Sequence, residues 1–304
     1  MKVNSSPLVT IIMNCYNGEK YLHESISSVI NQKYKNWELI FWDNKSHDNS
    51  RKIVKSFNDI RIKYFLAKKF TNLHKARNLA LKKAKGKYIS FLDTDDLLLE
   101  DKLLLQVKKL EEIKLSFIYS NCYLKNDNTF LKKKKYMYKK LLEGYISEKL
   151  LIDFQVALPT ILIKKNIINN FLFNESYKIV GDRDLIMRIS LKEKFCCINT
   201  PLATYRIHSN NFSGKNKLLE IEELQHWIKE FKKKNKKKYN LDEAIFKKFE
   251  NKLKIKKKIY LLKGINQKIF LIKKLITDPN LFNFSNCLKN FLPSSIKSKF
   301  FFFH

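Results

Sequence analysis

Residues 87–101, KYISFLDTDDLLLED, carry a β-prone, mostly apolar segment directly into three aspartates. Residues 88–92 have the length and composition of a buried strand. Asp93, Asp95 and Asp96 follow that strand without a spacer. Because the chain has a net charge of +32, such a concentration of carboxylates requires a local cause.

The sequence around this stretch alternates between strand and helix patterns. Apolar and aromatic runs predict strands at residues 8–13, 37–42, 62–65 and 88–92, and a further strand around 116–122. Apolar residues at three- and four-residue spacing predict helices over roughly residues 21–30, 49–57, 72–84 and 102–113. This alternation predicts an α/β fold with a central mixed, mostly parallel sheet.

Polar clusters follow three of the predicted strands. They are Asn14 to Asn17, Asp43 to Asp48, and Asp93 to Asp96. In parallel sheets, ligands gather beyond the carboxyl ends of the strands. The placement therefore predicts a binding site at that edge, while the competing explanation for single acids is the capping of a following helix.

The composition limits the classes of protein. With 304 residues and 44% hydrophobic content, the chain can form one large domain or one domain with an appendage. Its basic residues are 55 lysines and only 6 arginines, whereas phosphate and base recognition favours arginine. No aromatic residues interleave with the lysine runs 132–135 and 232–238. We therefore expect no nucleic-acid partner, and keep a basic nucleic-acid-binding protein as the alternative.

Cysteine usage and hydropathy indicate where the protein works. The five cysteines form no zinc or thioredoxin spacing and are expected to be reduced and buried. The N-terminal apolar run is too short for a signal peptide, and nothing approaches the ~18 apolar residues of a membrane span. These features predict a cytoplasmic protein.

A change in composition near Gly214 divides the chain into residues 1–213 and 214–304. The second part holds 23 lysines, no arginine and 8 acids. Its pattern is helical, and apolar patches follow at residues 259–276 and 300–303. Two explanations fit: peripheral contact with the anionic inner leaflet of a membrane, or helices packed on the first domain with solvated lysines.

The scarcity of glycine affects how a nucleotide could be held. The chain has only 6 glycines and neither a GxGxxG nor a GxxxxGK[ST] motif. Phosphates would then need carboxylates acting through a divalent cation, Mn²⁺ or Mg²⁺.

The sequence resembles the family 2 glycosyltransferases. The segments that carry the resemblance span roughly residues 8–213 in the family's order: VTIIMNCYNGEKYLHESISSVINQ, ELIFWDNKSHDNS, ARNLALKKAKGKYISFLDTDD, GDRDLIMR and TYRIH. The resemblance implies the GT-A fold, a Rossmann-like nucleotide-binding fold, followed here by a basic helical C-terminal region.

The resemblance also implies roles for residues in the first two strand-end loops and in the next helix. Asn14, Tyr16 and Asn17 match the loop that walls the nucleotide site. Asp43 matches the acid that hydrogen-bonds the base, often uracil. Arg77, within the Ala-Arg-Asn segment, would lie near the diphosphate or orient the acidic loop.

The later motifs supply the reaction centre. By resemblance, Asp93 faces the ribose or donor sugar, Asp95 binds the metal, and His208 reaches the diphosphate or metal. Asp182 matches the general base. Asp184 instead has a structural explanation, an ion pair with the residue four positions on, Arg188.

Three departures from the family pattern blur the identity of the donor. Asn44 replaces the second acid after Asp43, Gly181 stands where a glutamate is expected, and the glycine often found ahead of the Ala-Arg-Asn segment is missing. None of these changes removes a residue assigned to catalysis.

Together these features predict a metal-dependent inverting glycosyltransferase. It would move a sugar from a nucleoside-diphosphate sugar, expected to be a UDP-sugar, to a hydroxyl of a saccharide or lipid-linked glycan in surface polysaccharide biosynthesis. A noncatalytic relative acting as a scaffold at a membrane surface is the second alternative. The sequence makes no prediction of oligomeric state.

Overall fold

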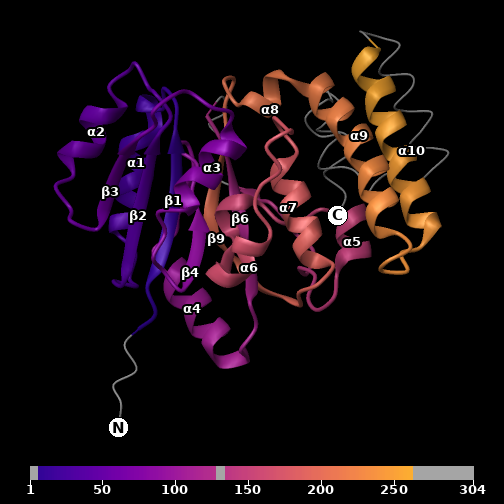
Figure 1. Ribbon diagram of the computed structural model, residues 1–304, viewed down its shortest axis with the longest axis horizontal. Coiled ribbons are helices and arrows are strands. Elements are labelled where there is room, and N and C mark those ends of the chain that lie inside the picture. Colours follow the sequence, from indigo (N-terminus) through magenta and orange to yellow (C-terminus); the bar gives the residue numbers. More distant parts are fainter. Residues whose placement is uncertain (1–5, 128–133, 263–304) are drawn as a thin grey trace. The chain divides into compact units, whose positions relative to one another are not determined.

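The computed structural model describes residues 6–127 and 134–262. Its first two strands form the buried centre around which the helices pack. Strand β1 (Val9–Cys15) and strand β2 (Trp37–Asp43) are buried along their whole length. Odd-numbered residues of β1 pack into one core with helix α1 (Glu19–Ile30), helix α2 (Ser50–Ser56) and helix α4 (Lys102–Ile113). The opposite face of β1 contacts helix α3 (Leu73–Leu81). Helices therefore cover both faces of the sheet (Figure 1).

The first half of the sheet is entirely parallel. Strand β3 (Ile62–Leu66), β2, β1 and strand β4 (Tyr88–Phe91) lie side by side in that order. The strands and helices predicted for residues 8–113 are all present near the expected bounds. One short strand was not expected: β5 (Leu97–Leu98) follows the aspartates directly.

The second half of the sheet is mixed. Strand β8 (Leu162–Lys164) pairs antiparallel with β4 and with strand β6 (Phe117–Asn126). Strand β9 (Phe195–Ile207) runs parallel to β6 and antiparallel to β5, while β7 (Lys134–Lys135) pairs with β6. The described residues thus form a nine-stranded mixed α/β sheet, which confirms the predicted fold class.

Short helices connect these strands. They are α5 (Ser147–Ile152), the 3₁₀ turn η1 (Leu158–Thr160), α6 (Lys165–Asn170) and α7 (Gly181–Ser190). Among the described residues, β9 is followed by helices α8 (Phe212–Lys215), α9 (Lys217–Asn235) and α10 (Glu243–Leu261). Up to Leu261 the helical pattern predicted after residue 214 is present, and α9 buries Ile221, Leu224 and Ile228. The rest of the predicted helical region lies outside the described residues.

The chain divides into two compact units, residues 1–247 and 248–304. The change in composition at residues 213 and 214 lies inside the first unit. Compactness alone does not test independent folding, so the division at residue 213 stays a prediction. The second apolar patch and most of the first lie outside the described residues.

Two expectations from composition can be compared with the structure. Four cysteines, Cys15, Cys122, Cys196 and Cys197, are buried and form no disulfide, as predicted. The fifth, Cys287, lies outside the described residues. Across the described part of the chain, no helix is both long and apolar enough to cross a membrane.

Candidate active site

The loops after β1 and β2 lie together because these strands end at the same level. Cys15 pairs with Asp43 in the parallel register. The backbone N–H of Asn17 donates to Ser46 Oγ at 3.0 Å, and Asp48 Oδ2 accepts from the N–H of Glu19 at 2.9 Å. Asp48 therefore supports the start of α1.

The loop that carries Asp93, Asp95 and Asp96 is fixed against the first of these loops. A Cβ on Gly18 would lie only 2.9 Å from Thr94 Oγ1, so the two loops are in close contact. Ser25 Oγ, from α1, donates to the carbonyl oxygens of Asp93 and Asp96 at 3.2 and 2.8 Å. All three predicted polar clusters thus meet at the carboxyl edge of the sheet.

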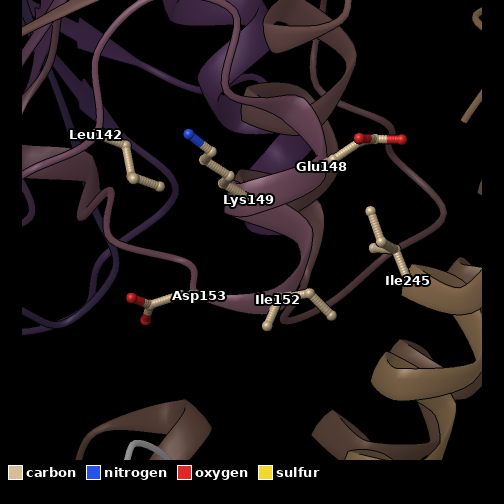
Figure 2. A pocket seen from close by; sticks show the side chains of 6 residues that line it. All are labelled: Leu142, Glu148, Lys149, Ile152, Asp153 and Ile245. Carbon is tan, nitrogen blue, oxygen red and sulfur yellow. The ribbon is translucent and has the colours of Figure 1, made fainter. Parts of the chain in front are cut away.

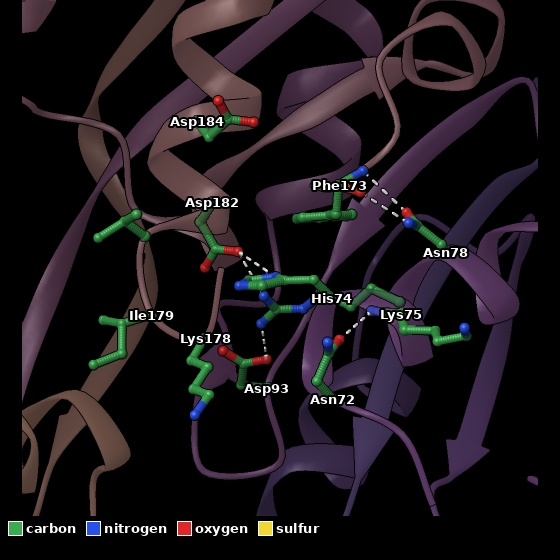
Figure 3. Close-up of polar contacts among 12 residues, drawn as sticks. Asn72, His74, Lys75, Asn78, Asp93, Phe173, Lys178, Ile179, Asp182 and Asp184 are labelled. Carbon is green, nitrogen blue, oxygen red and sulfur yellow. Dashed lines mark hydrogen bonds and ion pairs between the residues drawn. The ribbon is translucent and has the colours of Figure 1, made fainter. Parts of the chain in front are cut away.

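A single arginine joins two of the predicted site acids. Arg77 Nη2 donates to Asp93 Oδ1 at 2.7 Å, and Arg77 Nη1 donates to Asp182 Oδ1 at 2.5 Å. Figure 3 labels the two acids, Asp93 and Asp182. The guanidinium is only 2% exposed, whereas the two carboxylates are 35% and 31% exposed. These contacts are compatible with the role of orienting the acidic loop, which stays a prediction for Arg77.

Asp182 lies at the first turn of α7. Its ionic partner, Arg77, comes from helix α3, about a hundred residues earlier in the chain. Burial is the main cause that raises the pKa of Asp182 to about 6, with Arg77 opposing the rise and Asp93 adding to it. A carboxylate that titrates near neutral pH is suited to general-base catalysis.

Asp95 and His208 form a second pair beside that of Arg77 and Asp182. His208 Nε2 lies 2.9 Å from Asp95 Oδ2, and Asn211 Nδ2 donates to the same oxygen at 3.2 Å. Desolvation by burial and the charge of Asp93 raise the pKa of Asp95, while His208 lowers it. One carboxylate and one imidazole suit a divalent transition metal, although the described residues contain no cluster of three His, Cys, Asp or Glu ligands.

Arg206 secures this acidic loop, a role that the sequence analysis missed. Its Nε donates to the carbonyl oxygen of Asp95 at 2.8 Å, and its side chain also pairs with Glu24 and Asp127. Arg206 stands in the TYRIH segment, two residues before His208. In a chain with so few arginines, each one was a signal for charge-assisted hydrogen bonds with fixed geometry.

Asp96 does not cap the next helix, contrary to the explanation considered for it. The residues after it form β5, and α4 begins only at Lys102 with Asp101 as its N-cap residue. Asp96 Oδ1 accepts from the backbone N–H of Arg206 at 2.9 Å. Burial and the nearby Asp95 and Asp93 raise its pKa well above the usual range. Asp96 therefore joins the loop to β9.

The loop predicted to wall the nucleotide site has one side chain without hydrogen-bond partners. Asn14 is 8% exposed, and neither atom of its amide group has a hydrogen-bond partner among the described residues. A buried amide without partners is costly, and a bound ligand would satisfy it. Asp43 differs, because its oxygens accept from Tyr64 Oη at 2.6 Å and from the N–H of Ser46 at 2.7 Å. Its contact with a base stays a prediction.

Two exposed aromatic rings stand at the same edge. Tyr16 is 50% exposed and Phe70 is 58% exposed, and their ring centroids are 4.7 Å apart. Phe70 lies in the loop after β3 and was not predicted as a site residue. Aromatic faces of this kind provide a stacking surface for a flat ring.

Structural roles account for two other residues near the site. Asp184 pairs with Arg188 at 2.8 Å, which confirms the predicted contact at helical spacing, and it also accepts from Trp227 Nε1 at 3.1 Å. Asn78, from the Ala-Arg-Asn segment, exchanges two hydrogen bonds with the backbone of Phe173. Asn78 thus fixes the segment that leads to α7.

A hollow of about 400 Å³ lies elsewhere, lined by residues of α5, the segment before it and the start of α10 (Figure 2). The lining residues are Leu142, Glu148, Lys149, Ile152, Asp153 and Ile245. None of the predicted site residues is among them, so the hollow is separate from the acidic loops.

The sequence profile of Glycosyl transferase family 2 matches residues 10–188, more than half of the chain and all of the acidic loops. The chain belongs to glycosyltransferase family 2. His208 and Arg206 lie beyond the matched region, so their placement rests on the geometry above. Membership makes this chain a glycosyltransferase and displaces the alternative of a nucleic-acid-binding protein.

Two relatives of this glycosyltransferase come from Escherichia coli. One is UDP-Glc:alpha-D-GlcNAc-diphosphoundecaprenol beta-1,3-glucosyltransferase WfgD, 34% identical over 218 residues, which are 67% of this chain and 81% of that protein. The other is the enzyme of the same description named WfaP, 30% identical over 224 residues, or 70% of this chain and 82% of that protein.

Solved structures confirm the fold of this family member. The crystal structure of S. aureus TarS 1-349 in complex with UDP-GlcNAc superposes with a TM-score of 0.65 at 18% identity. The match covers 88% of this chain and 79% of that chain. The predicted GT-A fold is therefore confirmed.

Proposed function

We propose that this glycosyltransferase moves a sugar, with inversion, from a UDP-sugar to a hydroxyl of a lipid-linked saccharide. The observation that carries the proposal is the double contact of Arg77 with Asp93 and Asp182. It joins a donor-side acid and a base with a raised pKa through one guanidinium. The names of the Escherichia coli relatives support UDP-glucose as donor and a GlcNAc-diphosphate lipid as acceptor.

The nucleotide would occupy the edge formed by the loops after β1 and β3. The unpartnered amide of Asn14 supports a polar contact there, and the Tyr16 and Phe70 rings support stacking of the base. We assign Asn17 to the wall of this site because it holds the loops after β1 and β2 together through its backbone and side chain. Asp43 would contact the base, and Asp93 the ribose or sugar.

Asp182 is proposed as the base for the acceptor. Arg77 already engages its Oδ1, so Oδ2 would take the proton as the acceptor oxygen attacks the anomeric carbon. The bond from that carbon to the diphosphate oxygen breaks in the same displacement, and the nucleoside diphosphate leaves from the opposite face. One displacement of this kind inverts the anomeric configuration.

A divalent cation, Mn²⁺ or Mg²⁺, is proposed to be held by Asp95 and His208. When bound, it would neutralise the charge that grows on the leaving diphosphate. The donor atoms fit this use, because burial disfavours the bare charge of Asp95 and a cation would compensate it. Asn211 and Arg206 hold the pair in place from β9 and the segment after it.

We propose further that the enzyme works at the cytoplasmic face of a membrane, where a lipid-linked acceptor would be reached. The lysine-rich residues 214–304 support this location, since anionic headgroups attract basic segments. A noncatalytic scaffold is disfavoured, because Asp93, Asp95 and Asp182 are all retained and held in one arrangement.

The deciding experiment is a screen of UDP-glucose, UDP-GlcNAc and UDP-galactose by thermal shift, each with Mn²⁺, Mg²⁺ or EDTA. Ligand binding to the folded state raises Tm by mass action, so the donor is the sugar nucleotide with the largest cation-dependent rise. Transfer to a synthetic GlcNAc-diphosphate lipid then identifies the acceptor. Asp95→Asn should lose the cation-dependent part of the rise. An equal rise for all three nucleotides in EDTA would contradict both the donor and the metal assignments.

A further inference from the structure

His74 fills the space in which residue 181 would carry a side chain. A Cβ built on Gly181 would overlap His74 Nε2 and lie 2.5 Å from its Cε1, closer than real Cβ atoms approach ring atoms. The ring is 1% exposed and stacks on Phe173, with centroids 5.7 Å apart and planes 12° apart (Figure 3). Both rings are buried, and Asn78 fixes the backbone of Phe173 through two hydrogen bonds.

The imidazole contacts its surroundings as a neutral ring. Burial, with a smaller effect from Arg77, lowers the pKa of His74 to about 3. Neither ring nitrogen has a hydrogen-bond partner among the described residues, and Nδ1 is 3.9 Å from Asp182 Oδ1. That distance is too long for a hydrogen bond, and an uncharged ring forms no ion pair. His74 therefore acts on α7 through steric contact alone.

We propose that His74 is a positioning residue for Asp182. Gly181 is the first residue of α7 and Asp182 is the second, so a ring seated against Gly181 fixes how closely the first turn of α7 approaches α3. His74 and Arg77 are three residues apart on α3 and share one face of that helix. The same face therefore supplies both the steric stop for Gly181 and the ion partner for Asp182.

This pairing gives the departure at residue 181 a physical cause. The resemblance leads one to expect glutamate there, yet a side chain of any size would collide with the His74 ring. Gly181 has no left-handed backbone that would itself demand glycine. The missing side chain at 181 and the ring at 74 are thus complementary, because the ring leaves no room for a Cβ at 181.

The inference rests on the proposed role of Asp182 and is tested by a double-mutant cycle on residues 74 and 181. Transfer from UDP-glucose to the GlcNAc-diphosphate lipid and Tm are measured for Gly181→Ala, His74→Ala and the double variant. G181A should lower kcat at least tenfold with KM for UDP-glucose nearly unchanged, because the base is displaced while the donor loops are untouched. H74A should also lower kcat, because α7 loses its stop.

The double variant gives the most specific prediction. With the ring removed, the methyl group introduced by G181A has room and partly fills the gap, so kcat should exceed that of either single variant. Alanine also favours a helical backbone over glycine. G181A should therefore lower Tm in the His74 background and raise it in the H74A background. If G181A does not fold, the kcat and Tm of the double variant, compared with those of H74A, still test the positioning role of His74.

Matched controls separate this inference from general damage and from the proposed function. Gly214→Ala meets only an ordinary 3.6 Å contact with Asn211 Cβ, and His23 is exposed on α1, so G214A and H23A should keep wild-type kcat. Asp182→Asn tests the base alone. Activity retained in D182N would overturn the proposed function. An inactive D182N together with additive losses, or with a fully active G181A, would overturn the positioning role of His74.

Discussion

At the scale of residues, the raised pKa that suits Asp182 to the proposed role of base also makes the folded protein less stable at neutral pH. Its folded-state pKa of about 6 lies above the ordinary value of 3.8, so the fold disfavours the charged form. The folded protein keeps this proton between pH 4 and 6, where the unfolded chain has released it. The contribution of Asp182 to stability is therefore greatest below about pH 4 and falls as pH rises to about 6.

Asp182→Asn should consequently separate activity from stability. The amide removes a carboxylate whose charge the fold disfavours, so at pH 7.5 we expect a Tm equal to or above that of the wild type. Loss of the general base should lower kcat by roughly 10²- to 10⁴-fold. Thermal melting and a transfer assay on the same preparation check both. A markedly lower Tm with kcat retained would show that Asp182 is structural.

The pH dependence of the wild type gives an independent prediction. Because the base must be deprotonated, kcat/KM should rise about tenfold per pH unit below 6 and level off above it. The measurement is kcat/KM from pH 5 to 8, with Tm recorded at each pH. A flat profile across this range would exclude Asp182 as the titrating base.

The sequence could predict the identity of the site acids but not their partners. Asp93, Asp95 and Asp182 stand in recognisable motifs, and parallel strands had to bring their ends together. The contact of Arg77 with Asp182 joins positions 105 residues apart, and no local pattern encodes such a pair. The contact of His74 with Gly181 could not be predicted for a similar reason, since it exists only once α3 and α7 have packed.

At the scale of elements, Arg206 ties β9 to the acidic loop and to α1. Its guanidinium is 3% exposed and contacts Glu24 at 2.8 Å, Asp127 at 3.3 Å and the carbonyl oxygen of Asp95 at 2.8 Å. Arg206→Ala should lower the free energy of unfolding by about 2–4 kcal/mol, since several charge-assisted hydrogen bonds are lost together. It should also reduce kcat, because Asp95 loses its support.

Arg61→Ala is the matched control for this prediction. Arg61 pairs with Asp59 at 2.7 Å and lies over the Trp37 ring at 3.7 Å, and it contacts none of the acidic loops. Urea unfolding and kcat are measured for both variants. R61A should lose some stability with kcat unchanged. The role of Arg206 would be refuted by an R206A variant that keeps wild-type kcat.

Helix α4 carries a further buried cation, Lys102, which gives a prediction about stability. Lys102 is fully buried, and its Nζ donates to Ser90 Oγ at 2.8 Å and to the carbonyl oxygen of Ile161 at 3.1 Å. Desolvation lowers its pKa to about 7. Between pH 7 and about 10 the unfolded chain binds a proton that the folded chain lacks, so stability from this group rises with pH.

The effect of Lys102→Met on stability should therefore change sign between pH 6 and pH 10. At pH 6 the variant avoids burying a cation and should be more stable than the wild type. At pH 10 the wild-type amine is neutral and keeps both hydrogen bonds, so the variant should be less stable. Urea midpoints at the two pH values test this, and parallel shifts at both would contradict a buried, titrating Lys102.

Apart from β5, the elements before residue 113 were predictable because each strand or helix is strongly patterned and bounded by polar residues. β5 was not, because it has only the residues Leu97 and Leu98 and exists through pairing with Ala203 and Thr204 on β9. β9 itself continues through residues 199–201, Asn-Thr-Pro, which break any apolar pattern. Pairing with β6, which shifts register at Asn121, holds the strand together there.

At the scale of the whole molecule, the distribution of lysines leads to a prediction about location. In the run 232–238, Lys232 and Lys236 pair with Glu243 at 2.5 and 2.7 Å. The other four, Lys233, Lys234, Lys237 and Lys238, are exposed. The full chain should co-sediment with phosphatidylglycerol vesicles and be released by salt, since each lysine near an anionic surface contributes about 1 kcal/mol.

Changing those four exposed lysines to glutamate should weaken the vesicle binding at least tenfold while Tm and transfer to a detergent-solubilised acceptor stay unchanged. Phosphatidylcholine vesicles are the control for nonspecific association. Equal binding of both vesicle types, or binding that salt does not reduce, would contradict the electrostatic attachment and favour the alternative in which the lysines only face solvent.

The position of Arg77 between two acids has a consequence for the order of events in a turnover. A donor that draws Asp93 away from the guanidinium leaves that cation to Asp182 alone, which lowers the proton affinity of the base. Thermodynamic linkage makes the effect mutual, so deprotonation of Asp182 must in turn favour the donor-bound state. With the roles proposed for Asp93 and Asp182, the shared arginine would thereby couple binding of the donor to deprotonation of the base, and the sugar nucleotide would bind before the acceptor.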